Sequence, residues 1–339
     1  MNLVTGATGH IGNVLVRQLL ERGERVRALV RPGKHLLALE GLDVDLAQGD
    51  ILDIDSLERA MQGVEVVYHL AARISLAAGR DSETELVNHC GALNVLAAAR
   101  RSGVRRLVYA SSIYALHKPP DGQPIDESQP FDADGCRGAY DCSKALASLA
   151  MQRAAANSFQ AVIVCPTAVI GPYDYHYSDT GRAIRLYVRP GLKFYVDGAY
   201  DFVDVRDAAR GFILAGEKGR SGETYILSGD RLTVQEVLET AWKAAGCQYP
   251  SLKVPLWLAY FAADWMPAYV KLTGARPLFT RYSLDAICSN SYASHAKASR
   301  ELGYQPRPAR QAITDSVNWF QERNDAGAYV AERFTQAAL

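Results

Sequence analysis

The chain has 339 residues, which is more than one small hydrophobic core requires and predicts a large core domain with a smaller second lobe. Its 37 basic and 37 acidic residues cancel, so no field over the whole molecule would attract nucleic acid or an anionic membrane. We therefore expect a small-molecule partner.

The cysteines and the first residues indicate the compartment. The six cysteines have neither CxxC spacing nor the density of a disulfide scaffold, so we expect free thiols in a reducing cytosol and no metal site. They are Cys90, Cys136, Cys142, Cys165, Cys247 and Cys288. The opening residues MNLVTGATG belong to a predicted strand and not to a signal peptide, so we expect a cytoplasmic location.

Apolar runs of strand length alternate with helix-period segments through the first half of the chain. This pattern requires parallel strands joined by helical crossovers, so it predicts an α/β fold with a doubly wound parallel sheet. Strands are expected at residues 2–5, 25–30, 44–48, 64–70, 106–110, 161–165, 202–205 and 224–227. Helices are expected from about residue 11 until Gly23, and at 56–62, 83–101 and 140–156.

The remaining segments suggest a loop and a second lobe. Residues 118–138 are rich in Pro, Gly and Asp, which predicts a long surface loop of the kind that often covers a site. The alternation loosens after Pro166 and resumes later, and the chain is mostly helical from about residue 233. The predicted division is a core of residues 1–165 and 200–230, and a smaller, mostly helical C-terminal substrate lobe of residues 166–199 and 231–339.

The most apolar stretch, residues 256–272, is interrupted by Asp264, Pro267 and Lys271. It is therefore too short to span a membrane, and we interpret it as a helix of the lobe. An amphipathic contact with a membrane surface stays open as an alternative, because aromatic residues could share one face of this helix. They are Trp257, Tyr260, Phe261 and Trp265.

The first predicted strand leads directly into TGATGHIG, which places Gly6, Gly9 and Gly12 before an amphipathic helix. Glycines let the backbone turn tightly and approach a pyrophosphate, while the helix N-terminus offers free N–H groups. A glycine triplet alone would indicate only a tight turn, but between a strand and a helix it predicts dinucleotide binding by a Rossmann sheet. The other residues of this loop that we assign to the cofactor are Thr8, His10 and Ile11.

The residue after the second strand discriminates between the two nicotinamide cofactors. A carboxylate there would accept hydrogen bonds from the adenosine ribose, but this chain has Arg31. An arginine fork fits a 2′-phosphate, so NADP(H) is preferred, with NAD(H) possible. The alternative interpretation is a solvated surface arginine, and Lys34 is open to the same two interpretations.

The segment AYDCSKALAS places Tyr140 and Lys144 four residues apart on one face of a predicted helix. A lysine ammonium near a phenol favours the phenolate, so we expect a lowered pKa for Tyr140 and proton exchange with a substrate oxygen. Ser111 and Ser112 follow a strand, where a hydroxyl can orient a carbonyl, although serines there are also ordinary turn formers.

Several segments together resemble the extended short-chain dehydrogenase/reductase family, over essentially the whole chain. In chain order they are TGATGHIG, GDILD, HLAA, YASS, YDCSK, PTAVIGP, DFVDVRDAA and LGYQPRP. The last is similar to a closing motif of NAD-dependent epimerase/dehydratase relatives. The resemblance implies an NAD(P)-dependent oxidoreductase.

The resemblance also implies roles for individual residues. Tyr140 would be the catalytic acid/base, Lys144 would hold the nicotinamide ribose and tune Tyr140, and Ser112 would position the substrate oxygen, in preference to Ser111. Asn88 would have a mainly structural role. The remaining cofactor contacts would be Asp50 and Ile51 beside adenine, Leu70, Ala71 and Ala72 along the cofactor, and Pro166 and Thr167 near the nicotinamide amide.

Within the family, the chain looks most like aldehyde, dihydroflavonol and cinnamoyl-CoA reductases, with 3β-hydroxysteroid dehydrogenases nearby. Arg31 suits that branch, and Pro166-Thr167 stands where sugar-nucleotide epimerases commonly have Asn-Pro. We therefore expect reduction of an aldehyde or ketone by hydride from nicotinamide C4 and a proton from Tyr140. The pocket would be aromatic, drawing on Tyr173, Tyr175, Tyr177, Tyr187, Phe194 and Tyr195.

Two other functions remain as alternatives. One is a sugar-nucleotide epimerase or dehydratase that keeps NAD tightly bound, and the other is a protein that senses the NADP redox state without chemistry. Retention of Ser112, Tyr140 and Lys144 together argues against the second alternative. Family members often pair through the helices matching residues 83–101 and 140–156, so a homodimer is expected.

Overall fold

The computed structural model describes residues 1–33, 35–75, 79, 81–136, 138–273 and 280–325. Lys34, a second candidate for phosphate contact, and residues 326–339, the end of the predicted lobe, lie outside the described residues.

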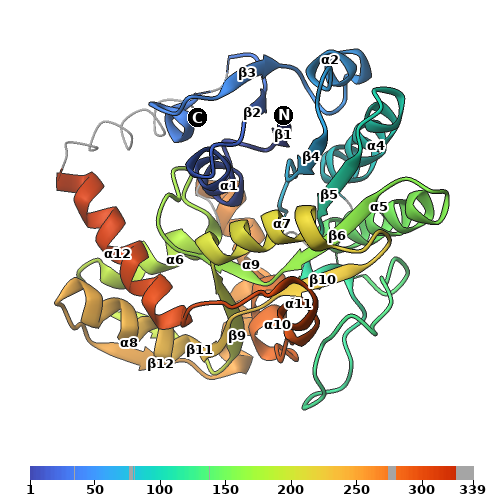
Figure 1. Cartoon of the computed structure of the whole chain (residues 1–339). Coiled ribbons are helices and arrows are strands. Elements are labelled where there is room, and N and C mark those ends of the chain that lie inside the picture. Colours follow the sequence, from blue (N-terminus) through green and yellow to red (C-terminus); the bar gives the residue numbers. More distant parts are fainter. Residues whose placement is uncertain (34, 76–78, 80, 137, 274–279, 326–339) are drawn as a thin grey trace.

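A sheet of seven parallel strands forms the centre of the molecule, in the order β10-β6-β5-β4-β1-β2-β3 (Figure 1). The strands are β1 (Asn2–Thr5), β2 (Val26–Val30), β3 (Asp45–Gln48), β4 (Val66–His69), β5 (Arg106–Ala110), β6 (Ala161–Pro166) and β10 (Thr224–Leu227). The predicted doubly wound Rossmann sheet is therefore confirmed. The strand order reverses between β1 and β4, and open sheets of this kind bind ligands at the carboxyl ends beside such a reversal.

Helices cover both faces of this sheet, because successive strand residues point to opposite sides. Leu3 packs into the apolar cluster under α2 (Ile54–Ala60), α4 (Gly91–Arg101) and α5 (Ala139–Ala156). Val4, the next residue, packs into the cluster under α1 (His10–Glu21), α7 (Val205–Lys218) and α11 (Ala296–Leu302). The buried residues Val14, Leu15 and Leu19 form the inner face of α1, as their helical spacing predicts.

The single helix predicted for residues 83–101 is instead a run of three pieces. These are α3 (Ser82–Glu85), a π-helical turn η2 (Leu86–Cys90) and α4. Within η2, the Asn88 side chain accepts a hydrogen bond from Arg73 N at 2.8 Å and donates to Arg73 O at 2.9 Å and Ser143 Oγ at 3.1 Å. Asn88 thus ties the segment after β4 to α5, in agreement with a structural role.

The second part of the molecule is built around a three-stranded sheet in the order β11-β9-β7. Its strands are β7 (Ala168–Ile170), β9 (Ala199–Asp204) and β11 (Asp230–Thr233), and its covering helices are α6 (Asp179–Val188), α8 (Val234–Ala245) and α12 (Ala309–Asp325). The strand predicted at 202–205 is present as β9, but it pairs with β7 and β11 and does not return to the main sheet. The division of residues between core and lobe remains a prediction.

A smaller unit completes this part of the chain. It contains the parallel pair β8 (Lys193–Tyr195) and β12 (Ser251–Lys253), followed by α9 (Leu256–Thr273) and α10 (Arg281–Cys288). Trp257, Phe261 and Trp265 are exposed on α9, whereas Tyr260 donates a hydrogen bond to Asp285 at 2.8 Å. Across the described ranges, no helix combines the length and the apolar character that crossing a membrane requires.

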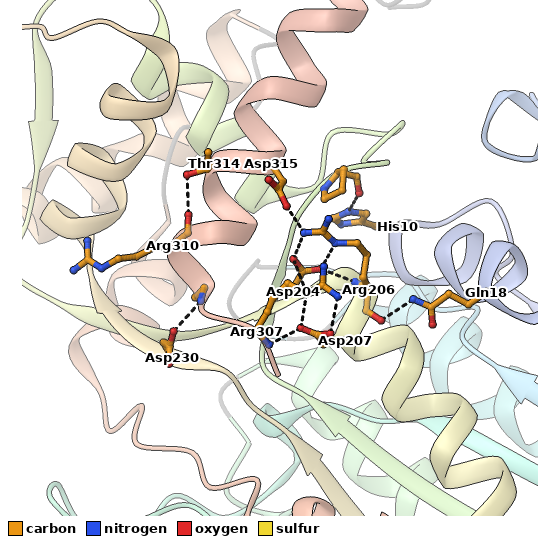
Figure 2. A network of polar contacts seen from close by, with 12 residues as sticks. His10, Gln18, Asp204, Arg206, Asp207, Asp230, Arg307, Arg310, Thr314 and Asp315 are labelled. Atoms are coloured by element: carbon orange, nitrogen blue, oxygen red, sulfur yellow. Dashed lines mark hydrogen bonds and ion pairs between the residues drawn. The ribbon is translucent and has the colours of Figure 1, made fainter. Parts of the chain in front are cut away.

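Partly buried ion pairs connect the two parts of the molecule (Figure 2). Arg206, at the start of α7, pairs with Asp204 and with Asp315 of α12. Arg307 donates to both carboxylate oxygens of Asp207, at 2.9 and 3.0 Å. Gln18 of α1 donates to the Arg206 carbonyl at 2.8 Å, so the same cluster reaches the first helix of the sheet domain.

The expectation of six free thiols is wrong at one pair. Cys136 and Cys142 form a disulfide with their Cα atoms 5.4 Å apart, which is within the range that a disulfide requires. The chain turns into α5 at Gly138, so the first turn of that helix brings residue 142 back beside the end of the preceding loop. Cys90, Cys165, Cys247 and Cys288 are free thiols.

Candidate active site

The glycine turn after β1 leaves no room for side chains. Gly6 has a φ of +71°, and a Cβ on it would lie 2.6 Å from the backbone nitrogen of Ala71. A Cβ on Gly12 would overlap the carbonyl oxygen of Gly6. Gly9 is the N-cap of α1 and provides no side-chain cap, so the first N–H groups of this helix are left to an external acceptor. This cradle fits a pyrophosphate.

The other predicted residues of the loop have different surroundings. Thr8 and Ile11 are half-buried, and Ile11 packs against the core beneath α1. The His10 ring hydrogen-bonds the carbonyl of Pro172 at 2.9 Å. The His10 side chain therefore holds the segment after β7, and its backbone is the part that belongs to the glycine turn.

The segment after β4 lies against this turn. Thr5 Oγ1 hydrogen-bonds His69 Nδ1 at 2.7 Å and accepts from Ala71 N at 3.2 Å, so the ends of β1 and β4 are held together. Burial and the nearby Lys144 lower the pKa of His69 to about 3, which keeps the ring neutral. Leu70 and Ala71 thus lie against Gly6, and Ala72 follows them, as a shared cofactor groove would need.

The predicted adenine-end residues follow β2 and β3 on the same edge of the sheet. Arg31 comes directly after β2 and is exposed. Asp50 accepts a hydrogen bond from Leu52 N at 2.9 Å, and Ile51 is buried against Gly91. Because β2 and β3 are paired in register at Val30 and Gln48, Arg31 and Asp50 both follow strand ends at one edge of the sheet.

Ser112, Tyr140 and Lys144 meet at the carboxyl ends of β5 and β6. The Ser112 hydroxyl hydrogen-bonds the Tyr140 phenol. Lys144 is buried, donates to the carbonyl of Ala110 at 2.6 Å and lies 5.0 Å from the ring centre of Tyr109. The proposed catalytic residues are therefore brought together by β5 and α5.

Burial controls the protonation of this group. It raises the pKa of Tyr140 to about 12, although the hydrogen bond from Ser112 acts in the opposite direction. It also lowers the pKa of Lys144 to about 7. The expectation of a lowered pKa for Tyr140 is therefore wrong for this structure, because desolvation of the phenolate is the largest influence on that pKa. Tyr140 is a protonated donor near neutral pH.

The two serines after β5 have different partners. Ser111 Oγ hydrogen-bonds Ser148 Oγ at 2.7 Å, and Ser148 in turn donates to the Lys144 carbonyl at 2.7 Å. Ser111 thus fastens β5 to α5, whereas Ser112 contacts Tyr140. Their positions after the strand do not show which serine belongs to the catalytic group, but their hydrogen bonds assign that place to Ser112.

Pro166 is the last residue of β6 and Thr167 follows it, and both are buried. Thr167 Oγ1 donates to Asp201 at 2.6 Å, and the same carboxylate accepts from Gly229 N at 2.9 Å. Burial raises the pKa of Asp201 to about 6, while these two hydrogen bonds lower it. The Thr167 hydroxyl is therefore occupied by its hydrogen bond to Asp201 of β9. Any contact of Thr167 with a cofactor would use its backbone.

A cavity of about 160 Å³ lies beside the first turn of α5. Its lining residues are Tyr114, Leu116, His117, Lys118, Asp132, Gly135, Cys136, Asp141, Tyr282 and Ala286. The aromatic residues that we expected around the substrate are not among them. Tyr175 and Tyr177 pack against Trp319 and Phe320 of α12, and Phe194 is exposed.

The sequence did not identify Asp141 and Tyr282, which line this cavity, as site residues. Tyr282 donates a hydrogen bond to Asp141, and its ring lies 5.7 Å from that of Tyr114. Asp141 was visible within AYDCSK, where its position beside Tyr140 was a usable signal. Tyr282 has no local signal, because it reaches the site from α10.

Comparisons with known proteins agree with this geometry. Residues 2–228 match the model of the NAD dependent epimerase/dehydratase family. The chain is 36% identical to "Sterol demethylase protein B" of Methylococcus capsulatus, covering 95% of this chain and 98% of the relative. It is 36% identical to a "Putative dihydroflavonol 4-reductase" of Synechocystis, covering 94% of each. The crystal structure of gox2253 is similar, with a TM-score of 0.83, 35% identity and coverage of 95% of this chain and 98% of that chain.

Proposed function

We propose, on the premise that the chain belongs to the NAD-dependent epimerase/dehydratase family of extended short-chain dehydrogenases/reductases, that it reduces an aldehyde or ketone with NADPH. Membership makes it an NAD(P)-dependent oxidoreductase. The observation that carries the finer proposal is the hydrogen bond between Ser112 and Tyr140, on the helix that also carries the buried Lys144.

The chain's own residues supply binding, orientation and a proton. The bound nicotinamide cofactor supplies the hydride that adds to the carbonyl carbon. Ser112 orients the carbonyl oxygen, and the Tyr140 phenol donates its proton to that oxygen. With a pKa of about 7, Lys144 is partly protonated near neutral pH, and its charged form, one helical turn from Tyr140, supports the phenolate as it forms.

Arg31 supports the preference for NADPH. Its guanidinium is exposed at the end of β2, so it is free of the core and accessible to a 2′-phosphate. Removing that charge would cost NADPH binding more than NADH binding. Replacement by aspartate would also provide the ribose acceptor that NAD-binding sheets commonly have.

Two further properties belong to this proposal. Leu86, Leu93 and Leu146 are exposed on η2, α4 and α5, which supports a homodimer formed through these helices. A monomer mass by light scattering at assay concentration would exclude it. The four free thiols support a cytoplasmic location, which cell fractionation can check.

The test is a parallel titration of the purified protein with NADPH and NADH, followed by nicotinamide fluorescence, for the native chain and for Arg31→Asp. We expect tighter binding of NADPH, lost in the variant, and then Tyr140-dependent NADPH oxidation by members of a panel of aldehydes and ketones. The panel should include sterol and dihydroflavonol ketones, following the names of the relatives.

Two results would overturn this proposal. Equal or tighter NADH binding, unaffected by Arg31→Asp, would remove the NADPH assignment. NAD that copurifies without exchanging, together with turnover of a sugar nucleotide, would replace the reductase with an epimerase or dehydratase.

A further inference from the structure

The disulfide between Cys136 and Cys142 closes a short loop of the chain that contains Tyr140, the proposed catalytic acid. The two cysteines are separated by six positions in the chain, and Tyr140 lies between them. Cys136 ends the long loop before α5, and Cys142 lies in the first turn of that helix. A bond formed or broken here therefore acts on the backbone that carries Tyr140.

The bridge also holds one wall of the cavity beside the site. Gly135 and Cys136 line that cavity together with Asp132 and Asp141. The loop is anchored before this wall, where Asp132 N donates to the Ala115 carbonyl at 2.9 Å, and after it, where Ala139 N donates to the Gly79 carbonyl at 3.2 Å. Between these anchors, Gly135 N donates to Asp132 at 2.7 Å, and the disulfide is the covalent link.

Both cysteines are accessible enough for exchange with a small thiol. Each is half-buried, whereas Cys165, the cysteine nearest the reacting groups, is fully buried. Disulfides in reducing compartments are usually transient or redox-sensing, because cellular thiols reduce them. The other four cysteines of the chain are free thiols. The bridge therefore fits a redox-sensing disulfide better than a disulfide of a cross-linked scaffold.

We propose that Cys136 and Cys142 form a reversible redox-modification site that controls substrate binding in the cavity beside Tyr140. Oxidation joins the two sulfur atoms and releases both thiol protons, while two electrons pass to a small-molecule disulfide that is cleaved into two thiols. Reduction by a dithiol reverses the reaction. In the oxidised protein the disulfide holds the cavity wall in place. In the reduced protein residues 133–136 lose this covalent link and become more mobile. The glycine turn after β1 and the predicted adenine-end residues after β2 and β3 lie at other strand ends, so the affinity for NADPH should change little.

The first experiment counts the thiols that each redox condition leaves in the protein. The folded protein is equilibrated in buffers with increasing ratios of oxidised to reduced glutathione and quenched with acid. It is then unfolded in the presence of N-ethylmaleimide, so that the buried Cys165 also reacts, and measured by intact mass and peptide mapping. We expect a change from six reactive cysteines to four, with the loss mapped to Cys136 and Cys142. The variant Cys136→Ser/Cys142→Ser should keep four at every ratio. Six thiols at all ratios, a bridge mapped to other cysteines, or a bridge reduced only on unfolding would overturn the proposal.

The second experiment measures the consequence. Amide hydrogen exchange over residues 131–142 should be faster in the reduced protein than in the oxidised protein, and the double serine variant should exchange like the reduced form in both conditions. The control Cys90→Ser/Cys288→Ser, which removes two exposed thiols, should respond like the native chain.

The kinetic arm rests on the proposed function. For a carbonyl substrate found by the screen, reduction should raise KM by about tenfold while the Kd for NADPH changes little, because a loosened cavity wall must be ordered again when the substrate binds. If no carbonyl compound is turned over, the reductase proposal fails, while the thiol count and amide exchange still decide the redox site. Equal exchange in both redox states, or equal KM values, would overturn the proposal.

Discussion

Tyr282 of α10 donates a hydrogen bond to the carboxylate of Asp141, although the two residues are 141 positions apart in the chain. Asp141 is buried and directly follows Tyr140 in α5. Burial and the negative charge of Asp141 keep the pKa of Tyr282 well above its usual range, so the phenol remains a donor. This contact fixes the lobe helix α10 to the first turn of the catalytic helix.

Replacing Tyr282 with phenylalanine should remove this link without opening a large cavity. We expect a loss of about 1–3 kcal/mol in the free energy of unfolding, because a buried carboxylate loses a donor. The value of kcat/KM should fall as well. Urea unfolding and steady-state kinetics measure the two effects, and Tyr292→Phe, at an exposed tyrosine, is the control. Equal effects of the two variants would contradict the assignment.

Alanine variants of Ser112 and Ser111, the two serines after β5, should have different effects, one on catalysis and the other on stability. Ser112→Ala removes the hydroxyl that contacts Tyr140, so kcat should fall by roughly 10²-fold or more, as for other groups that orient a proton transfer. Ser111→Ala removes the bond to Ser148 and should instead lower stability by about 1 kcal/mol. Kinetics and unfolding of both variants check this pattern, and the reverse pattern would exchange the two roles.

Lys144 should make stability depend on pH. Its pKa is lowered from 10.5 to about 7, so between these values the unfolded chain binds more protons than the folded chain. The contribution of Lys144 to the free energy of unfolding should therefore increase as the pH rises from about 7 to 10. In Lys144→Met this contribution is absent, so its urea midpoint should rise less over that window. Parallel pH slopes for the two proteins would show that Lys144 is not perturbed.

The glycine turn should tolerate no side chain at Gly12. A methyl group there would overlap the Gly6 carbonyl, so Gly12→Ala should weaken NADPH binding by at least about tenfold. Gly103→Ala is a useful control, because Gly103 has positive φ but open space around its Cα. That variant should lose some stability, by about 1 kcal/mol, and keep its NADPH affinity. Fluorescence titration distinguishes the two.

Arg307 and Arg310 provide a matched pair in the cluster of Figure 2. Arg307 bonds the buried Asp207, so Arg307→Met should cost about 1–3 kcal/mol, because that carboxylate loses two side-chain donors and keeps the backbone N–H of residue 307. Arg310 pairs with Glu236 at the surface, and Arg310→Met should cost less than about 1 kcal/mol. Similar urea midpoints for the two variants would contradict the importance of the buried pair.

Much of the sheet domain could be predicted from sequence, because apolar strand runs and the glycine turn are local signals. The strand β5 was predicted at its observed bounds, and Tyr140 and Lys144 were predicted to share a helix face. The sheet to which β9 belongs could not be predicted in this way, since it depends on pairing with β11. The π-helical turn at Asn88 and the bridge between Cys136 and Cys142 likewise depend on neighbours in space.

The helices α6, α8 and α12 have a consequence for how the chain folds during synthesis. Their shared apolar cluster joins Ile170 and Ile184 to Ile313 and Val317, which are synthesised much later. The last strand of the main sheet, β10, ends at Leu227, so that sheet can assemble earlier. Domains generally condense as their residues leave the ribosome. The nascent chain can therefore carry an assembled sheet, still without α11, while the apolar faces of residues 168–188 are uncovered. This interval is where chaperone binding or aggregation would act.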